Sequence, residues 1–347
     1  YQGKYSDAEG LHKKSLQILE GEFGKHHLEI ANSYNNLAKI YSIQGKCAIA
    51  EKSYEKSLQI RRELLGEDHP DTASVYSNLV GVYMDMGNYE KAQEMGEKSL
   101  QIRESVFGNS HPDTADSYRN LAEVYVCQGD YKQAEEMHKK SLLIMKKVFG
   151  EMHPNTAIGY NNLAGIYRNK GEYIEAKKLY ENSLQIYKEI FGENHSDTAL
   201  AYCNLASVYE NLEEDEKAEI LYKNSLQIRR GIFGESHSDT AISYNNLAGV
   251  YNKRGDYVKA KETYKKGLQI WQNVFGEKHP NTAISYNNLA NIYEKQGEYE
   301  KAEGLYKRSL QIREQVLGED HPDTAIGYNN LAGLYRHTGE YDIALIY

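Results

Sequence analysis

A period of 42 residues runs through the chain and limits what it can fold into. The five prolines are separated by 42 residues or by three times that number. They are Pro70, Pro112, Pro154, Pro280 and Pro322. A histidine series from His27 and a leucine series from Leu37 keep the same spacing, eight times each. Repetition without insertion predicts one array of stacked copies of a small unit, with no linker and no second domain.

Composition narrows the classes of partner. The 347 residues are 40% hydrophobic and 26% charged. No apolar run approaches the ~18 residues of a membrane helix, so no membrane-spanning helix is expected. The chain has 41 lysine and arginine residues and 50 aspartate and glutamate residues, which gives a net charge of -9. This negative charge disfavours nucleic acid as the main partner. Three scattered cysteines provide neither a disulfide framework nor a paired-cysteine zinc site. They fit a reducing compartment, and we expect a cytoplasmic protein.

Each unit opens with the pattern of an amphipathic helix, called helix A here. In the copy at Pro70–Met86, apolar side chains recur every three or four residues, which is the helical period. They are Ala73, Tyr76, Leu79, Val80 and Tyr83. A glycine such as Gly87 then closes the helix and turns the chain.

A second helix, helix B, follows at about Tyr89–Phe107 and ends at Gly108. Its expected apolar set is Tyr89, Ala92, Leu100, Ile102 and Val106. No segment alternates with the period of two that a strand requires. The sequence therefore predicts an all-α protein built from helical hairpins.

The connection before each helix A carries capping residues. Pro70, Asp71 and Thr72 offer a rigid first position and polar caps, and Ser196 and Ser238 offer a hydroxyl in place of the proline. We expect each repeated histidine to tether its connection through a local hydrogen bond. Equivalent atoms on neighbouring packed helices lie roughly 8–10 Å apart, so the histidine row does not converge on a metal ion.

The joint at residues 211–215 of the fifth copy departs from this pattern. It reads Asn-Leu-Glu-Glu-Asp and lacks both the turn glycine and the tyrosine that follows it in most copies. We therefore expect a locally altered hairpin or a softer point near residues 211–216.

The repeated frame resembles the tetratricopeptide signature of an aromatic, leucine, a small residue and tyrosine in helix A, with alanine in helix B. The residues that carry the resemblance are Tyr76, Leu79, Val80, Tyr83, Gly87, Tyr89 and Ala92. The unit of 42 residues is eight residues longer than the usual tetratricopeptide unit and is similar to the unit of kinesin light chains. The resemblance implies a right-handed superhelical solenoid of about eight helix-turn-helix repeats.

We expect a single array that spans residues 1–347, and the 42-residue period sets the limits of its repeats. We expect a partial repeat at 1–23, seven full repeats at 28–65, 70–107, 112–149, 154–191, 196–233, 238–275 and 280–317, and a truncated one at 322–347. Because both ends fall inside a unit, we expect a fragment of a longer protein.

In helix A, numbered from Ala73 as position one, positions two, five, six, nine and thirteen lie opposite the apolar face. The resemblance implies that they line a concave groove that binds partner segments. Position six is asparagine in every copy: Asn36, Asn78, Asn120, Asn162, Asn204, Asn246, Asn288 and Asn330. Position five adds Asn161, Asn245, Asn287 and Asn329. These amides either bind the backbone of a peptide or orient the neighbouring repeat.

Position two changes along the array. It is polar in the first three copies and aliphatic afterwards, at Ile158, Leu200, Ile242, Ile284 and Ile326. This row either accepts hydrophobic anchors of a bound segment or packs against the adjoining helix A. Charges on this face are mixed, with Arg119 and Arg168 among acidic residues, so no uniform basic clamp is expected.

Trp271 occupies a helix B register that is arginine in other copies, at Arg61, Arg103, Arg229 and Arg313. An arginine register is usually solvated, so Trp271 is expected to be an exposed contact or a partly covered surface aromatic.

No catalytic motif of the protease, P-loop or hydrolase type is present, so we expect no enzyme, no cofactor and no metal. The sequence favours a non-catalytic scaffold or adaptor that binds a protein or peptide segment. The alternative is a sensor or regulatory array of a larger signalling protein of the nucleotide-switch ATPase type. A purely structural spacer is a third option.

Overall fold

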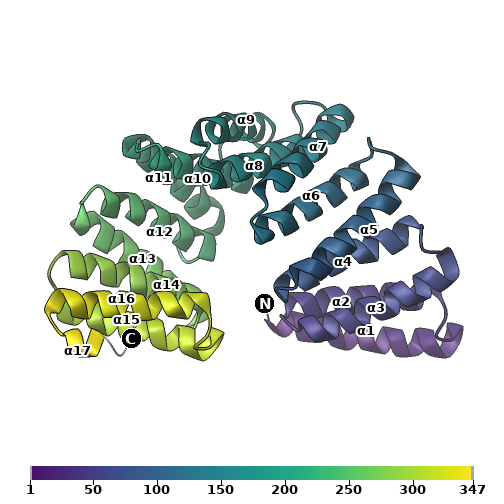
Figure 1. The fold of residues 1–347 in the computed structure, drawn as a ribbon, viewed down its shortest axis with the longest axis horizontal. Coiled ribbons are helices and arrows are strands. Elements are labelled where there is room, and N and C mark those ends of the chain that lie inside the picture. The colour runs from purple at the N-terminus through teal and green to yellow at the C-terminus, as the bar shows by residue number, and fades with distance from the viewer. Residues whose placement is uncertain (1, 345–347) are drawn as a thin grey trace. The chain divides into compact units, whose positions relative to one another are not determined.

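The computed structural model describes residues 2–344, with side chains from residue 7 onward (Figure 1). Over this range the chain forms 17 helices and no strand, which confirms the all-α prediction. The helix A elements are α2 (Leu28–Ile43), α4 (Pro70–Asp85), α6 (Pro112–Gln128), α8 (Pro154–Asn169), α10 (Ser196–Asn211), α12 (Ser238–Lys253), α14 (Pro280–Lys295) and α16 (Pro322–Thr338). The helix B elements are α1 (Gln2–Phe23), α3 (Cys47–Leu65), α5 (Tyr89–Phe107), α7 (Tyr131–Phe149), α9 (Tyr173–Phe191), α11 (Asp215–Phe233), α13 (Tyr257–Phe275), α15 (Tyr299–Leu317) and α17 (Tyr341–Ala344).

The chain divides into two compact units, residues 1–179 and 180–347, with the division inside α9. Within each unit, consecutive helices pack as antiparallel hairpins stacked one after another, which confirms the predicted helix-turn-helix solenoid. The single array over 1–347 stays a prediction. Residue 1 and residues 345–347 of the two predicted end repeats lie outside the described residues.

The core has the predicted apolar face of helix A and a second face that the pattern did not reveal. The predicted positions are buried in α4, from Ala73 to Tyr83. Val75 and Val82, at positions three and ten, are each only 1% exposed. Position three faces the preceding helix B, because Ser117 of α6 lies 3.1 Å from Ser99 of α5 between their hydroxyl oxygens. Each helix A therefore packs on both sides and leaves one narrow face uncovered.

The helix caps differ from the predicted ones. The N-cap of every helix A is the repeated histidine, and its Nδ1 accepts a hydrogen bond from the backbone N–H two residues later, as His195 does from Asp197 at 3.2 Å. Ser196 and Ser238 are the first helical residues, so the proposed hydroxyl caps were wrong. The histidine tether itself is confirmed. Six histidine rings also stack on the phenylalanine that ends the preceding helix B, as His111 does on Phe107 at 4.3 Å between ring centroids.

Many of the 31 tyrosines pair their hydroxyl with a carboxylate group. Tyr202, at position four of α10, donates to Glu193 in the preceding connection at 2.8 Å. Tyr83, at position eleven of α4, donates to Glu51 of α3 at 2.8 Å. Similar pairs recur in other copies. Tyrosine thus packs its ring in the core while its hydroxyl ties helix A to a neighbouring segment.

Two helix B predictions were wrong. Val106 is 47% exposed, because it lies on the outer side of the last turn of α5, whereas Ile102 one turn earlier is buried. The arginine register is not solvated: its four arginines are at most 8% exposed and Trp271 is 3% exposed. These side chains lie between successive helix A elements, where the arginines find backbone and side-chain acceptors.

Candidate functional site

The candidate site is the uncovered face of helix A, called the helix A surface here. It consists of positions two, five, six, nine, twelve and thirteen of α2, α4, α6 and α8 in the first unit, and of α10, α12, α14 and α16 in the second. Two hollows lie on it. One, of about 140 Å³, lies between α6, α7 and α8, and the other, of about 570 Å³, is lined by α14, α15, α16 and α17.

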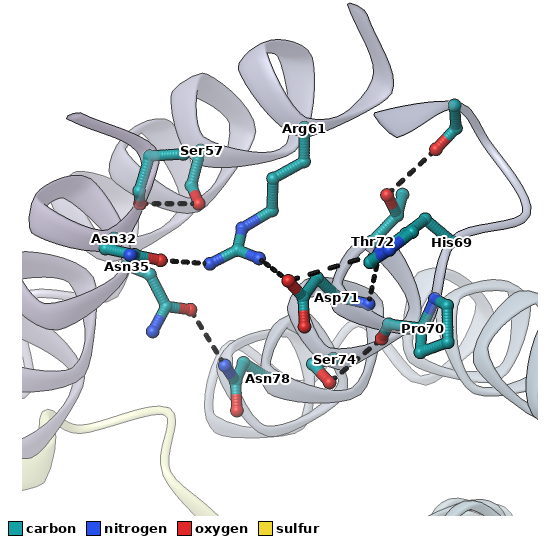
Figure 2. Close-up of polar contacts among 12 residues, drawn as sticks. Asn32, Asn35, Ser57, Arg61, His69, Pro70, Asp71, Thr72, Ser74 and Asn78 are labelled. Carbon is teal, nitrogen blue, oxygen red and sulfur yellow. Dashed lines mark hydrogen bonds and ion pairs between the residues drawn. The ribbon is translucent and has the colours of Figure 1, made fainter. Parts of the chain in front are cut away.

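The position-six asparagines link successive helix A elements. Asn78 donates its Nδ2 to Oδ1 of Asn35, a position-five residue of the preceding copy, at 3.0 Å (Figure 2). The same step joins Asn120 to the hydroxyl oxygen of Ser77 at 2.7 Å. Further pairs are Asn330 to Asn287 at 2.6 Å and a long contact of 4.0 Å from Asn246 to the sulfur of Cys203. These contacts give a physical basis to the alternative in which each asparagine orients the neighbouring repeat, with a side chain of that repeat as the acceptor.

The amides keep part of their surface in solvent. The position-six residues Asn78, Asn120, Asn162, Asn204, Asn246, Asn288 and Asn330 are half-buried, as are Asn161, Asn245 and Asn287 at position five. Asn245 donates to Ser285, a buried position-three residue of the next helix A, at 3.3 Å. An amide that donates one hydrogen to its neighbour keeps a second hydrogen and acceptor capacity, so a stacking role leaves room for ligand contacts.

The aliphatic residues at position two are partly exposed. Ile158 in the first unit is 38% exposed, and Leu200, Ile242 and Ile284 in the second are 45%, 39% and 41% exposed. Packing against the adjoining helix therefore covers only part of each side chain. The remaining apolar area of the second unit lies beside the half-buried amides of the same helices.

Behind position two lies the buried arginine register. Arg61 of α3 donates to Oδ1 of Asn32 at 2.6 Å, and its other terminal nitrogen lies 3.2 Å from the carboxylate of Asp71 (Figure 2). Arg103 of α5 likewise contacts Ser74 of α4 and the backbone oxygen of Asp113 of α6. The guanidinium therefore bridges position two of one helix A and the first turn of the next. Sequence reasoning missed this bridge.

The third copy has a different arrangement of charges. Arg119 at position five forms an ion pair with Asp116 at 2.9 Å, so it does not point toward a neighbouring amide. His138 of α7 is 2% exposed, and its Nε2 lies 3.6 Å from Glu123. Burial, together with the charge of Arg119, lowers the pKa of His138 to about 4. Arg168, the other predicted arginine, is half-buried near the end of α8.

Two kinds of site are absent from the described residues. In that part of the chain, no three His, Cys, Asp or Glu side chains come together as a metal-binding group. Within the same range, every helix is too short or too polar to cross a bilayer.

A family profile described as tetratricopeptide repeat matches the chain from end to end. The matched segments are residues 1–63, 38–83, 71–147, 121–169, 155–231, 197–269, 239–315 and 283–347. No curated protein matches the chain in sequence.

Solved structures with the same fold include kinesin-light-chain-like repeat proteins. BtubC (BKLC) from P. vanneervenii is 25% identical, with a TM-score of 0.58, over 67% of this chain and 94% of that one. A kinesin-light-chain-like protein from Podospora anserina with nearly identical repeats is 23% identical, with a TM-score of 0.53, over 60% of this chain and 98% of that one.

A signalling ATPase is also similar in fold. It is the Signal Transduction ATPase with Numerous Domains protein from Pyrococcus horikoshii, which has a tetratricopeptide repeat sensor. It is 18% identical, with a TM-score of 0.62, and the match covers 97% of this chain but 51% of that one. At this identity the likeness shows the fold alone.

Proposed function

Because the chain belongs to the tetratricopeptide repeat family, we propose that it is a non-catalytic scaffold whose helix A surface binds a segment of a partner protein. The observation that carries the proposal is the row at Leu200, Ile242 and Ile284, which leaves about two fifths of each aliphatic side chain exposed beside half-buried amides. Such a surface suits a peptide or helix that offers apolar side chains and backbone hydrogen-bonding groups. Neither nucleic acid nor membrane is the expected partner.

The apolar row supplies affinity in this proposal, and the asparagines supply orientation. Burying an aliphatic side chain fully is worth about 1.5–3 kcal/mol, so the exposed fraction of one residue contributes roughly 1 kcal/mol. Amides that donate to a neighbouring repeat are held in place before a ligand arrives, which lowers the entropy cost of binding. The charged residues Arg119 and Arg168 would then discriminate among segments by complementarity.

The test compares two double variants with equal loss of exposed aliphatic area. Ile242→Ser with Ile284→Ser removes the row from the helix A surface, whereas Ile232→Ser with Val274→Ser removes residues that are each 43% exposed near the ends of α11 and α13. Affinity capture should lose a partner with the first variant and retain it with the second. Equal capture by both, or loss by both together with a lower melting temperature, would contradict the proposal.

A second candidate is a sensor array of a signalling ATPase. The likeness over 97% of this chain to a protein with a tetratricopeptide repeat sensor supports it. A full-length reading frame with a phosphate-binding GxxxxGK[ST] segment outside these residues would favour this role, and a coiled coil there would favour the adaptor.

A further inference from the structure

The buried guanidinium groups of helix B define a slot that the chain itself fills in four copies. Figure 2 shows the first of them, where Arg61 lies between Asn32 of α2 and Asp71 of α4. In the other three, the guanidinium donates to the backbone oxygen of the second residue of the next helix A, at distances from 2.5 to 3.1 Å. In these four copies the slot thus offers oxygen acceptors to a planar group with several donors.

The third copy has the slot without the arginine. Met145 occupies the register in α7 and offers no donor. Position two of the same copy is Asp116, an acceptor that carries a full charge where the first two copies have Asn32 and Ser74. The 140 Å³ hollow lies here and is lined by Asp116, Met145 and Asn155, the last at the helix position that accepts from arginine elsewhere. At about 30 Å³ per water molecule, this volume exceeds that of one water.

A buried polar side chain in this hollow lacks a partner. Ser141 of α7 is 4% exposed and lines the hollow, and its hydroxyl has no hydrogen bond within the part of the chain the structure describes. The equivalent serines Ser57 and Ser309 donate to backbone oxygens of the preceding helix A at 2.8 and 2.7 Å. The Ser141 hydroxyl can therefore donate to, or accept from, a group that enters the hollow.

The hollow offers an anionic acceptor to a cation. Asp116 and Arg119 line it with opposite charges. Glu123 lies 3.6 Å from Nε2 of the lining residue His138, and burial raises the pKa of its carboxyl. His138, the remaining titratable group that lines the hollow, is uncharged at neutral pH, since burial keeps its pKa well below 7. Arg119 contacts one carboxylate oxygen of Asp116 and leaves the other for a second donor.

We propose that this hollow binds the guanidinium group of an arginine side chain presented by a partner segment. The arginine takes the place of the missing internal one: it pairs with Asp116, donates to the backbone oxygen of Asn155 and lies against Met145. The inference rests on the proposed function, because it names a side chain that the bound segment carries. It places one specificity contact in the first unit, between α6, α7 and α8.

The experiment uses the whole chain and small probes, so it needs no identified partner. Isothermal titration calorimetry compares N-acetylarginine amide with N-acetylcitrulline amide, its uncharged isostere, and with N-acetylglutamate amide. We expect the arginine probe to bind about fivefold more tightly than citrulline, the upper range for a partly exposed ion pair. In spectra of ¹³C-methyl methionine, the Met145 resonance should shift with the arginine probe and stay in place with the other two.

Variants test the slot itself. Met145→Arg supplies the internal guanidinium that four copies already carry, so it should fold and abolish probe binding, whereas Tyr187→Arg at the same register of the next copy should leave binding intact. Asp116→Asn keeps the shape and should weaken binding two- to fivefold. Arg119→Ala removes the competing cation and should tighten binding.

Several results would overturn the proposal. They are equal affinity for arginine and citrulline, tighter binding of the glutamate probe together with weaker binding by Arg119→Ala, and unchanged binding by Met145→Arg. Failure of these probes alongside capture that depends on Ile242 and Ile284 would reject the arginine slot and leave the proposed function standing.

Discussion

Replacing Glu213 with glycine should stabilise the joint between α10 and α11. Glu213 has a φ of +61°, which makes it the non-glycine residue with left-handed backbone in the described range. The equivalent residue in α12–α13 is Gly255, with a φ of +77°. Left-handed backbone costs a residue with a Cβ about 1–2 kcal/mol. Glycine avoids this cost but loses roughly 0.5–1 kcal/mol of chain entropy on folding, so the net gain is about 0.5–1 kcal/mol.

Other contacts of this joint should stay unchanged by the substitution. The backbone N–H of Glu214 donates to the oxygen of Tyr209 at 2.9 Å, as the corresponding residue does in other hairpins. Asp215 stands where most copies have tyrosine, and it pairs with Lys253 at 2.9 Å. This ion pair replaces part of the support that the missing tyrosine gives elsewhere. The strained residue is therefore the main remaining source of softness.

Native-state hydrogen exchange measures the effect locally, because repeat arrays open in parts. In the wild type, residues 211–216 should exchange faster than residues 169–174 and 253–258. Glu213→Gly should slow exchange at 211–216 by roughly two- to fivefold, which corresponds to 0.5–1 kcal/mol.

The reverse change provides a matched control. A Cβ at Gly255 would meet no atom within 4 Å, so Gly255→Glu introduces backbone strain without a clash, and exchange at 253–258 should accelerate by the same factor. If exchange in the wild type is no faster at 211–216, or if Glu213→Gly leaves it unchanged, the strain argument is refuted.

Three further predictions concern His138, Trp271 and His111. As the pH falls from 6.5 toward 4, His138 is protonated in the unfolded chain before it is protonated in the folded one, so the free energy of unfolding falls by up to about 1.4 kcal/mol per pH unit. His138→Tyr should flatten the pH dependence of the free energy of unfolding measured with urea. Parallel pH profiles of the variant and the wild type would contradict this prediction. Trp271 should show short-wavelength emission and weak acrylamide quenching, and Trp271→Ala should cost about 3–5 kcal/mol in urea unfolding, whereas ready quenching would place it in solvent. His111→Ala removes an N-cap and should cost about 0.5–2 kcal/mol by thermal unfolding, while Pro112→Ala should cost less.

The helices could be predicted because their apolar period appears in every copy. The burial of Val75 and Val82 could not be read from the same period, since it depends on the preceding helix B covering a second face of helix A. A single apolar stripe is typical of a helix that packs on one side only. A helix inside a stack of repeats packs on two sides, so it buries residues outside that stripe. Among the positions predicted to lie opposite the apolar face, position two keeps part of its surface in solvent, as Ile242 and Ile284 show.

The arginine register shows why pairwise geometry escapes sequence reasoning. An arginine in a sequence indicates a solvent-exposed side chain. Its burial here is explained by the hydrogen-bond acceptors that two successive helix A elements provide. One signal was available: the same register contains Met145, Tyr187 and Trp271, and apolar or aromatic residues at one register of an array indicate a covered position. The asparagine contacts had a similar signal, because positions five and six of adjacent copies supply acceptor and donor.

An array of near-identical copies provides its own reference for judging a departure. Where Arg119 stands at position five, the next copy's Asn162 faces a side chain without an acceptor, so the amide step found at Asn78 and Asn120 has no counterpart there. Where Met145 stands in the arginine register, Asp116 loses the internal partner that Asn32 and Ser74 have. Both departures occur at the same joint, where Asp116, now paired with Arg119, and Asn162 line one hollow. Neutral substitutions at unrelated positions have no reason to place groups that can bind a ligand around the same hollow. This joint is therefore a stronger candidate for selective recognition than the regular copies around it.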